Sequence, residues 1–167
     1  SALSVLSHMA PALVEPAAWA ACGQSVQATL VDGLGAARAP AVRQAALASL
    51  AALLRTSAAA EQEAERELRS PADDKARKAA KASRKAQKAI GQSLGEGLPA
   101  MLGALEGALQ AGGTDATAAL ESLAEVAENQ PRLFRPVLPQ VVEGMASLAV
   151  SAQLPATQRI AALEVVV

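Results

Sequence analysis

A short apolar phrase, Ala-Ala-Leu-x-x-Leu, recurs along the chain and constrains its fold more than any other feature. The phrase is complete at Ala45–Leu50 and at Ala118–Leu123, and shorter forms of it begin at Ala2 and Ala161. The first leucines of successive copies are 44, 73 and 43 residues apart. The chain therefore repeats a unit of about 43 residues, interrupted once by about 30 additional residues.

A repeat of this length predicts the fold class. Periods of about 40–47 residues are typical of HEAT and armadillo-like solenoids, in which each repeat is a pair of α-helices. The composition agrees, because hydrophobic residues make up 51% of the chain and aromatic residues only 1%. Alanine and leucine favour helices, whereas strands favour β-branched and aromatic residues. We therefore expect an all-α fold, an α-α superhelix of about three helix pairs preceded by one leading helix.

The repeats and the interruption divide the chain into three segments. Residues 1–56 contain the end of one repeat, expected as a single helix over 2–14, and then one full pair that ends near Thr56. Residues 57–92 are a charged inserted linker, helical or disordered. Residues 93–167 carry two further repeats.

Glycines and prolines predict where the helices of this last segment begin and end. Gly112-Gly113 predicts a sharp helix stop, and Thr114 or Asp115 predicts the cap of the next helix. Pro131 breaks the chain after that helix. We expect a single helix over 132–151 to follow, with its prolines tolerated only near its start.

Charge is distributed unevenly between the insertion and the repeats. The whole chain has a net charge of −1, with 15 basic and 16 acidic residues. Residues 57–92 hold nine basic and six acidic residues, and the remainder holds six basic and ten acidic ones. The repeats are therefore mildly acidic and the insertion is basic.

A basic run closes the insertion. Its large side chains are all cationic, so we expect it to have no apolar face to bury. One interpretation is a surface for nucleic acid, an acidic protein or a localisation receptor. The other is a solvated linker arm, which we favour because no aromatic side chain is interleaved to stack on bases. We therefore expect no nucleic-acid partner; the candidate contacts would be Lys75, Arg77, Lys78, Lys81, Arg84, Lys85 and Lys88.

An acidic stripe marks the helix after Asp115. Glu121, Glu125 and Glu128 follow one another at i, i+4 and i+7 and so share one helix face. Glu164 stands at the matching place one repeat later. Clustered carboxylates on a concave surface would attract a Lys/Arg-rich segment. The alternative interpretation, with equal weight, is that these glutamates are ordinary surface residues that keep the protein soluble.

The residues show no arrangement for catalysis. The chain has one histidine, His8, and one cysteine, Cys22, and its serines have no base to activate them. We therefore expect no enzyme activity, no cofactor and no metal. A single cysteine cannot form an intrachain disulfide, so a reducing intracellular compartment is expected. No apolar run reaches the length of a membrane span, so no membrane insertion is expected.

The run Ala119–Pro136 ends Glu-Asn-Gln-Pro-Arg-Leu-Phe-Arg-Pro. It resembles a helix-pair junction of the importin-β (karyopherin-β) superfamily, and residues 94–167 are most similar to the importin-5 (karyopherin β-3) branch of that superfamily. Gly97–Leu102 resembles the opening of the repeat before it, and Thr157–Val166 the next inner helix. Residues 2–56 match more loosely. The insertion departs from the family, so nothing transfers to the basic run.

The resemblance implies a nuclear transport receptor. Such a protein would hold basic cargo proteins and Ran-GTP along a concave face lined by the second helix of each repeat. It would bind nucleoporins, shuttle between cytoplasm and nucleus through the nuclear pore, and act as a monomer. The alternatives are a HEAT-repeat scaffold of a multiprotein complex, and a nucleic-acid-binding module that uses the basic run. The chain starts at Ser1 without methionine and stops within an apolar helical phrase, so we expect it to be part of a longer protein.

Overall fold

The computed structural model describes residues 2–111 and 114–166, and this part of the chain is all-helical, without a strand. None of the helices described is both long enough and apolar enough to span a membrane. The elements in chain order are α1 (Ala2–His8), α2 (Ala10–Leu13), α3 (Pro16–Leu34), α4 (Pro40–Arg69), α5 (Asp74–Gly95), α6 (Leu98–Ala111), α7 (Thr114–Asn129), the 3₁₀-helix η1 (Pro131–Phe134), α8 (Leu138–Val150) and α9 (Ala156–Glu164).

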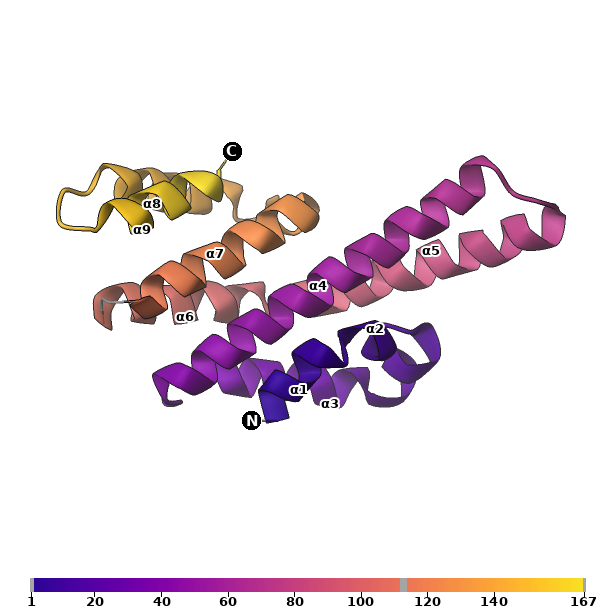
Figure 1. Ribbon diagram of the computed structural model, residues 1–167, viewed down its shortest axis with the longest axis horizontal. Helices are drawn as coiled ribbons and strands as arrows, with labels where there is room; N and C mark the ends of the chain where they lie inside the picture. Colours follow the sequence, from indigo (N-terminus) through magenta and orange to yellow (C-terminus); the bar gives the residue numbers. More distant parts are fainter. Residues whose placement is uncertain (1, 112–113, 167) are drawn as a thin grey trace.

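The helices pack as three consecutive pairs, α3/α4, α6/α7 and α8/α9 (Figure 1). The second helices of the pairs are neighbours, since α4 contacts α7 and α7 contacts α9. Helices α1 and α2 lie against α4. The expected all-α fold is therefore confirmed for the described residues.

The leading segment forms two short helices where one was expected. Helix α1 ends at His8, and α2 begins at Ala10 with Pro11 in its first turn. A proline inside a helix has no amide hydrogen to donate and its ring clashes with the preceding turn. The chain therefore breaks at Met9 and restarts, while Leu3 and Leu13 still reach the core.

The junction after α7 also differs from the expectation. Pro131–Phe134 is a 3₁₀-helix, and α8 begins only at Leu138. The predicted single helix over 132–151 is therefore wrong in its first part. Pro136 and Pro139 are three residues apart and cannot both lie in a helix interior. The chain turns first, and Pro139 then lies in the first turn of α8. Amides in the first turn have no hydrogen-bond acceptor within the helix, so proline loses no hydrogen bond there.

The end of α6 can be compared with its prediction only in part. The predicted stop at Gly112-Gly113 lies outside the described residues, and so does the side chain of Thr114. Helix α6 reaches Ala111 and α7 begins at Thr114, which places Asp115 in the first turn of α7.

The two complete copies of the recurring phrase lie on α4 and α7 and supply the core, and its shorter forms lie on α1 and α9. Leu50 is 1% exposed, and Leu120 and Leu123 are fully buried. In the short form on α9 the alanines are buried, but Leu163 is 49% exposed. Val165, two residues later, is buried instead.

Helix α4 does not end near Thr56 but continues to Arg69, and α5 returns along it as the second half of a hairpin (Figure 1). We call residues 57–90 of this hairpin the arm. Asp73 caps α5, since its carboxylate accepts a hydrogen bond from the amide of Ala76 at 2.6 Å. The insertion is thus an ordered pair of helices built onto the first repeat.

Along α5, the positions that pack against α4 are separated alternately by four and three residues. The basic run was predicted to have no apolar face to bury, but one side of it is buried, with Ala80 at 1% exposure. The other positions on this side are filled by small or neutral side chains: Gln87 is 4% exposed, and Ser83 is half-buried. On α4 the facing side chains Ser57 and Ala64 are also small and buried. Small residues allow the two helix backbones to approach closely, which compensates for the small area each side chain buries.

Polar side chains fix the base of the arm to the first helices. The amide of Gln87 donates to the carbonyl of Val14, at the end of α2, over 2.9 Å. The hydroxyl of Ser57 donates to the backbone carbonyl of Gln87 at 3.1 Å. Nearby, Gln27 of α3 and Ser93 of α5 exchange two hydrogen bonds. Buried polar groups of this kind are costly to leave unpaired. These hydrogen bonds therefore fix the base of the arm against α2 and α3.

Candidate functional site

A surface groove of about 860 Å³ lies where the last two helix pairs meet. Helices α7, α8 and α9 and the 3₁₀-helix η1 all contribute to its walls. Its lining residues are Glu121, Ala124, Glu125, Ala127, Glu128, Pro131, Phe134, Leu138, Val141, Val142, Glu164, Val165 and Val166.

All four residues of the predicted acidic stripe line this groove. Glu121, Glu125 and Glu128 come from α7, and Glu164 is the last residue of α9. The buried face of α7 is occupied by alanine, leucine and valine, so the carboxylates are left on the opposite face. The sequence placed three of the four on one helix face; the fold brings the fourth to the same groove.

Beside the carboxylates the groove has an apolar surface that water reaches. Leu138 is 49% and Val142 42% exposed, and both belong to α8. Phe134 also lines the groove and is 4% exposed. These apolar residues were not predicted, although Leu138 and Val142 lie four residues apart within the helix expected over 132–151. Their spacing places them on one helix face, but it does not show that the fold leaves this face exposed in the groove.

The carboxylates differ in how far the protein itself neutralises them. Glu125 forms an ion pair with Arg55 of α4, which joins α7 to the first repeat. Within the described residues, Glu121, Glu128 and Glu164 form no ion pair. These three charges remain available to a cation that enters the groove, and low-dielectric walls strengthen their attraction.

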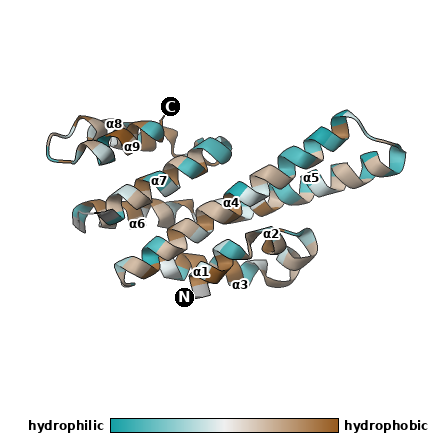
Figure 2. Ribbon diagram, in the orientation of Figure 1, coloured by the Kyte–Doolittle hydropathy of each residue, from teal (hydrophilic) through white to brown (hydrophobic). Residues whose placement is uncertain are grey.

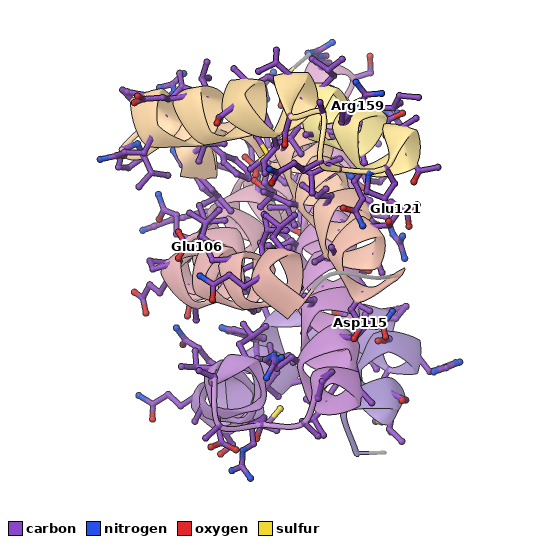
Figure 3. All side chains as sticks on the ribbon, turned by 90° about the vertical axis from the view of Figure 1, so that its left-hand side faces the viewer. Glu106, Asp115, Glu121 and Arg159 are labelled. Carbon is purple, nitrogen blue, oxygen red and sulfur yellow. The ribbon has the colours of Figure 1, made fainter. Side chains whose placement is uncertain are left out.

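The groove lies on one flank of the last helix pairs (Figure 3). Glu121 and Asp115, both on α7, lie on one side of the molecule, and Glu106 of α6 lies on the other (Figure 3). Glu106 is exposed and does not line the groove. It therefore provides a matched acidic position outside the site.

The second candidate surface is the outer face of α5. Six of its seven predicted contact residues are exposed, and Arg84 is half-buried. Hydrophilic residues are frequent along both helices of the arm (Figure 2). The acidic groove and this basic face are thus built on different helices, the first on α7–α9 and the second on α5.

Neither surface is arranged for metal chemistry. Among residues 2–111 and 114–166, no three His, Cys, Asp or Glu side chains come close enough together to hold a metal ion. His8 is exposed, and its Nδ1 lies 2.8 Å from the backbone carbonyl of Ser4. The Sγ of Cys22 donates to the carbonyl of Ala18.

Comparisons with known proteins do not assign the chain to a family. No family model, no curated protein and no solved structure matches it.

Proposed function

We propose that this chain is a protein-binding module that takes a basic, partly apolar segment of another protein into the groove between α7, α8 and α9. The observation that carries the proposal is the combination of three unpaired carboxylates with exposed Leu138 and Val142 in one groove. Such a groove complements a short segment in which lysine or arginine alternates with an apolar side chain. The proposed role is binding, without catalysis.

We further propose that the helix pairs form part of a HEAT-type solenoid and that the module belongs to a nuclear transport receptor. The support is the stacking of consecutive pairs, with α4, α7 and α9 in contact, together with the likeness of residues 94–167 to the importin-β superfamily. On this proposal the basic segment is part of a cargo protein. Ran-GTP would compete with it, and the protein would shuttle between cytoplasm and nucleus.

The binding part is tested by removing the three unpaired charges. Glu121→Gln, Glu128→Gln and Glu164→Gln together remove exposed attractions of about 0.2–1 kcal/mol each. The affinity for a fluorescent Lys/Arg-rich peptide that also carries leucine should therefore fall roughly tenfold. The matched control is Glu106→Gln with Glu143→Gln, both exposed and outside the groove, which should bind the peptide as the native chain does. Equal affinity in all three proteins would refute the groove as the binding site.

Glu125 is kept unchanged in this experiment. Its ion pair with Arg55 joins α7 to α4, so its substitution would mix a change in packing with a change in charge. The peptide should also lose affinity when its leucine is replaced by serine, since Leu138 and Val142 would then remain exposed to water.

The transport part is tested separately by competition. Ran-GTP added to the peptide complex of the full receptor should release the peptide, and Ran-GDP should not. A HEAT scaffold would bind its partner through a similar groove without any response to Ran-GTP. Peptide binding that ignores Ran-GTP would therefore retain the groove and reject the transport receptor.

A further inference from the structure

The exposed face of α5 has a regular pattern of cations that the groove does not explain. Arg77, Lys81, Arg84 and Lys88 are spaced i, i+4, i+7 and i+11, and so lie in one line along the helix. Lys78 and Lys85 lie beside that line. With a rise of 1.5 Å per residue, these six side chains form a basic face about 16 Å long. We call these six residues the basic face.

The rest of the helix fixes where this face points. The positions that pack against α4 are Ala80, Ser83, Gln87 and Ile90, which fall on the side opposite to Lys78 and Lys85. The hydrogen bonds of Gln87 to Val14 and to Ser57 prevent the helix from rotating about its axis. The cations are thus presented together, as one surface of an ordered helix.

The protein does not neutralise this surface. Within the described residues, none of the seven cationic side chains of α5 forms an ion pair. Two of the four glutamates in the outer half of α4, Glu63 and Glu65, pair instead with Arg66 and Arg69 of the same helix. Glu61 lines a small hollow together with Lys88 but does not pair with it.

Three kinds of anionic partner can be compared for this face: a membrane, an acidic peptide and a nucleic-acid duplex. A membrane-binding helix carries large apolar side chains opposite its cations, whereas the other exposed flank of α5 is made of alanines, Ala79, Ala82 and Ala89. A flexible acidic peptide would gain only exposed ion pairs, each worth about 0–1 kcal/mol. A nucleic-acid duplex carries condensed counterions, and their release favours binding even by a face without apolar anchors.

We propose that the basic face of α5 is a docking surface for the phosphate backbone of a nucleic-acid duplex, bound without sequence preference. A face of 16 Å spans about half a turn of duplex, and it has no aromatic side chain to stack on unpaired bases. A row of cations along one helix matches the row of phosphates on the duplex surface, which is the same for every sequence. The sequence alone favoured a solvated arm. The ordered helix with its cations aligned is the observation that reverses that preference.

Salt dependence gives the first quantitative test. Six phosphate contacts predict a slope of about −5 in a plot of log Kobs against log salt concentration. The probe is a fluorescent 20-base-pair DNA duplex of arbitrary sequence, titrated with the native chain between 50 and 200 mM salt; we expect binding in the weak range of non-specific contacts, with Kd near 10⁻⁴ M at the upper end. No binding at 50 mM salt overturns the proposal, and so does tighter binding of phosphatidylserine vesicles or polyglutamate than of the duplex at the same salt.

Matched variants then locate the surface. Lys81→Gln with Lys85→Gln removes two cations from the face and should lower the magnitude of the slope by about 1.8. Glutamine is as good a helix former as lysine, so helicity by circular dichroism should not change. Arg132→Gln with Arg135→Gln removes two exposed cations outside the arm and should leave both the affinity and the slope unchanged. An equal loss in the two double variants refutes the assignment to α5.

Discussion

The α6/α7 pair and the arm are both two-helix units, but they are held together by different side chains. The seam of α6 and α7 buries Met101, Leu105, Leu120 and Leu123. The seam of the arm buries mainly alanine, serine and one glutamine, with Ile90 at its base, while its outer surface carries about half of the charged residues of the chain. The arm is also rich in hydrophilic residues (Figure 2). A helix pair can therefore form either by burying large apolar side chains or by close approach of backbones across small ones.

This difference predicts how each unit fails. The α6/α7 seam loses stability when a large side chain is shortened and leaves a cavity. Apart from Ile90, the buried side chains of the arm seam are small or polar. The arm seam therefore loses stability mainly when a small side chain is enlarged or a hydrogen bond is removed. Three substitutions, in decreasing order of expected effect, separate the two cases.

Leu123→Ala should have the largest effect. Leu123 is fully buried on α7, and truncation of such a leucine costs about 2.7–5 kcal/mol. Urea denaturation of the variant should show this loss in the free energy of unfolding. Leu163→Ala, at a leucine that is 49% exposed, should cost well under half as much. Equal costs at the two positions would contradict the packing described for α7 and α9.

Ala80→Leu should have an intermediate effect, confined to the arm. Ala80 is 1% exposed between α5 and α4, so three extra carbon atoms would force the helices apart at a cost of about 1–3 kcal/mol. Hydrogen exchange should quicken over residues 57–90 and stay unchanged in α7. The control is Ala82→Leu on the exposed side of the same helix, which should be nearly neutral because leucine and alanine have similar helix propensities. If Ala80→Leu is also neutral, α5 does not pack on α4 through this face.

Gln87→Met should have the smallest of the three effects. The substitution keeps the size of the side chain but removes its hydrogen bond to the carbonyl of Val14. An unpaired buried acceptor costs about 1–2 kcal/mol, which should appear as faster exchange at the base of the arm and in α2. Gln92→Met, at an exposed position of α5, is the control. A stability equal to that of the native chain would show that the polar bonds do not hold the arm.

These regions also show what a sequence of this kind reveals. The acidic stripe could be predicted because the helix period alone places Glu121, Glu125 and Glu128 on one face. The apolar part of the groove could not, because the i, i+4 spacing of Leu138 and Val142 does not show which face of α8 stays exposed beside α7 and α9. The proximity of Glu164 to α7 depends on the packing of α9, which no local pattern specifies.

The buried face of the arm was not predicted, for a different physical reason. A hydrophobicity pattern identifies a buried face by its large apolar residues, and alanine is common both inside and outside this protein. Ala80 and Ala82 differ only in position, yet one is buried and the other exposed. The 4-3-4-3 spacing of alanine, serine and glutamine along α5 was the available signal, and it becomes visible only when small side chains are considered as a packing surface.

The most direct test of the central claim is to observe the groove while a partner binds. Methyl NMR spectra of the native chain can be recorded during titration with the Lys/Arg-rich, leucine-containing peptide. The proposed function predicts that the methyl signals of Leu138, Val142 and Val166, which line the groove, shift with the peptide concentration. Val5 and Val31, which are exposed elsewhere on the surface, should not shift. Binding that moves those two valines, or that leaves the groove methyls unchanged, would contradict the proposal.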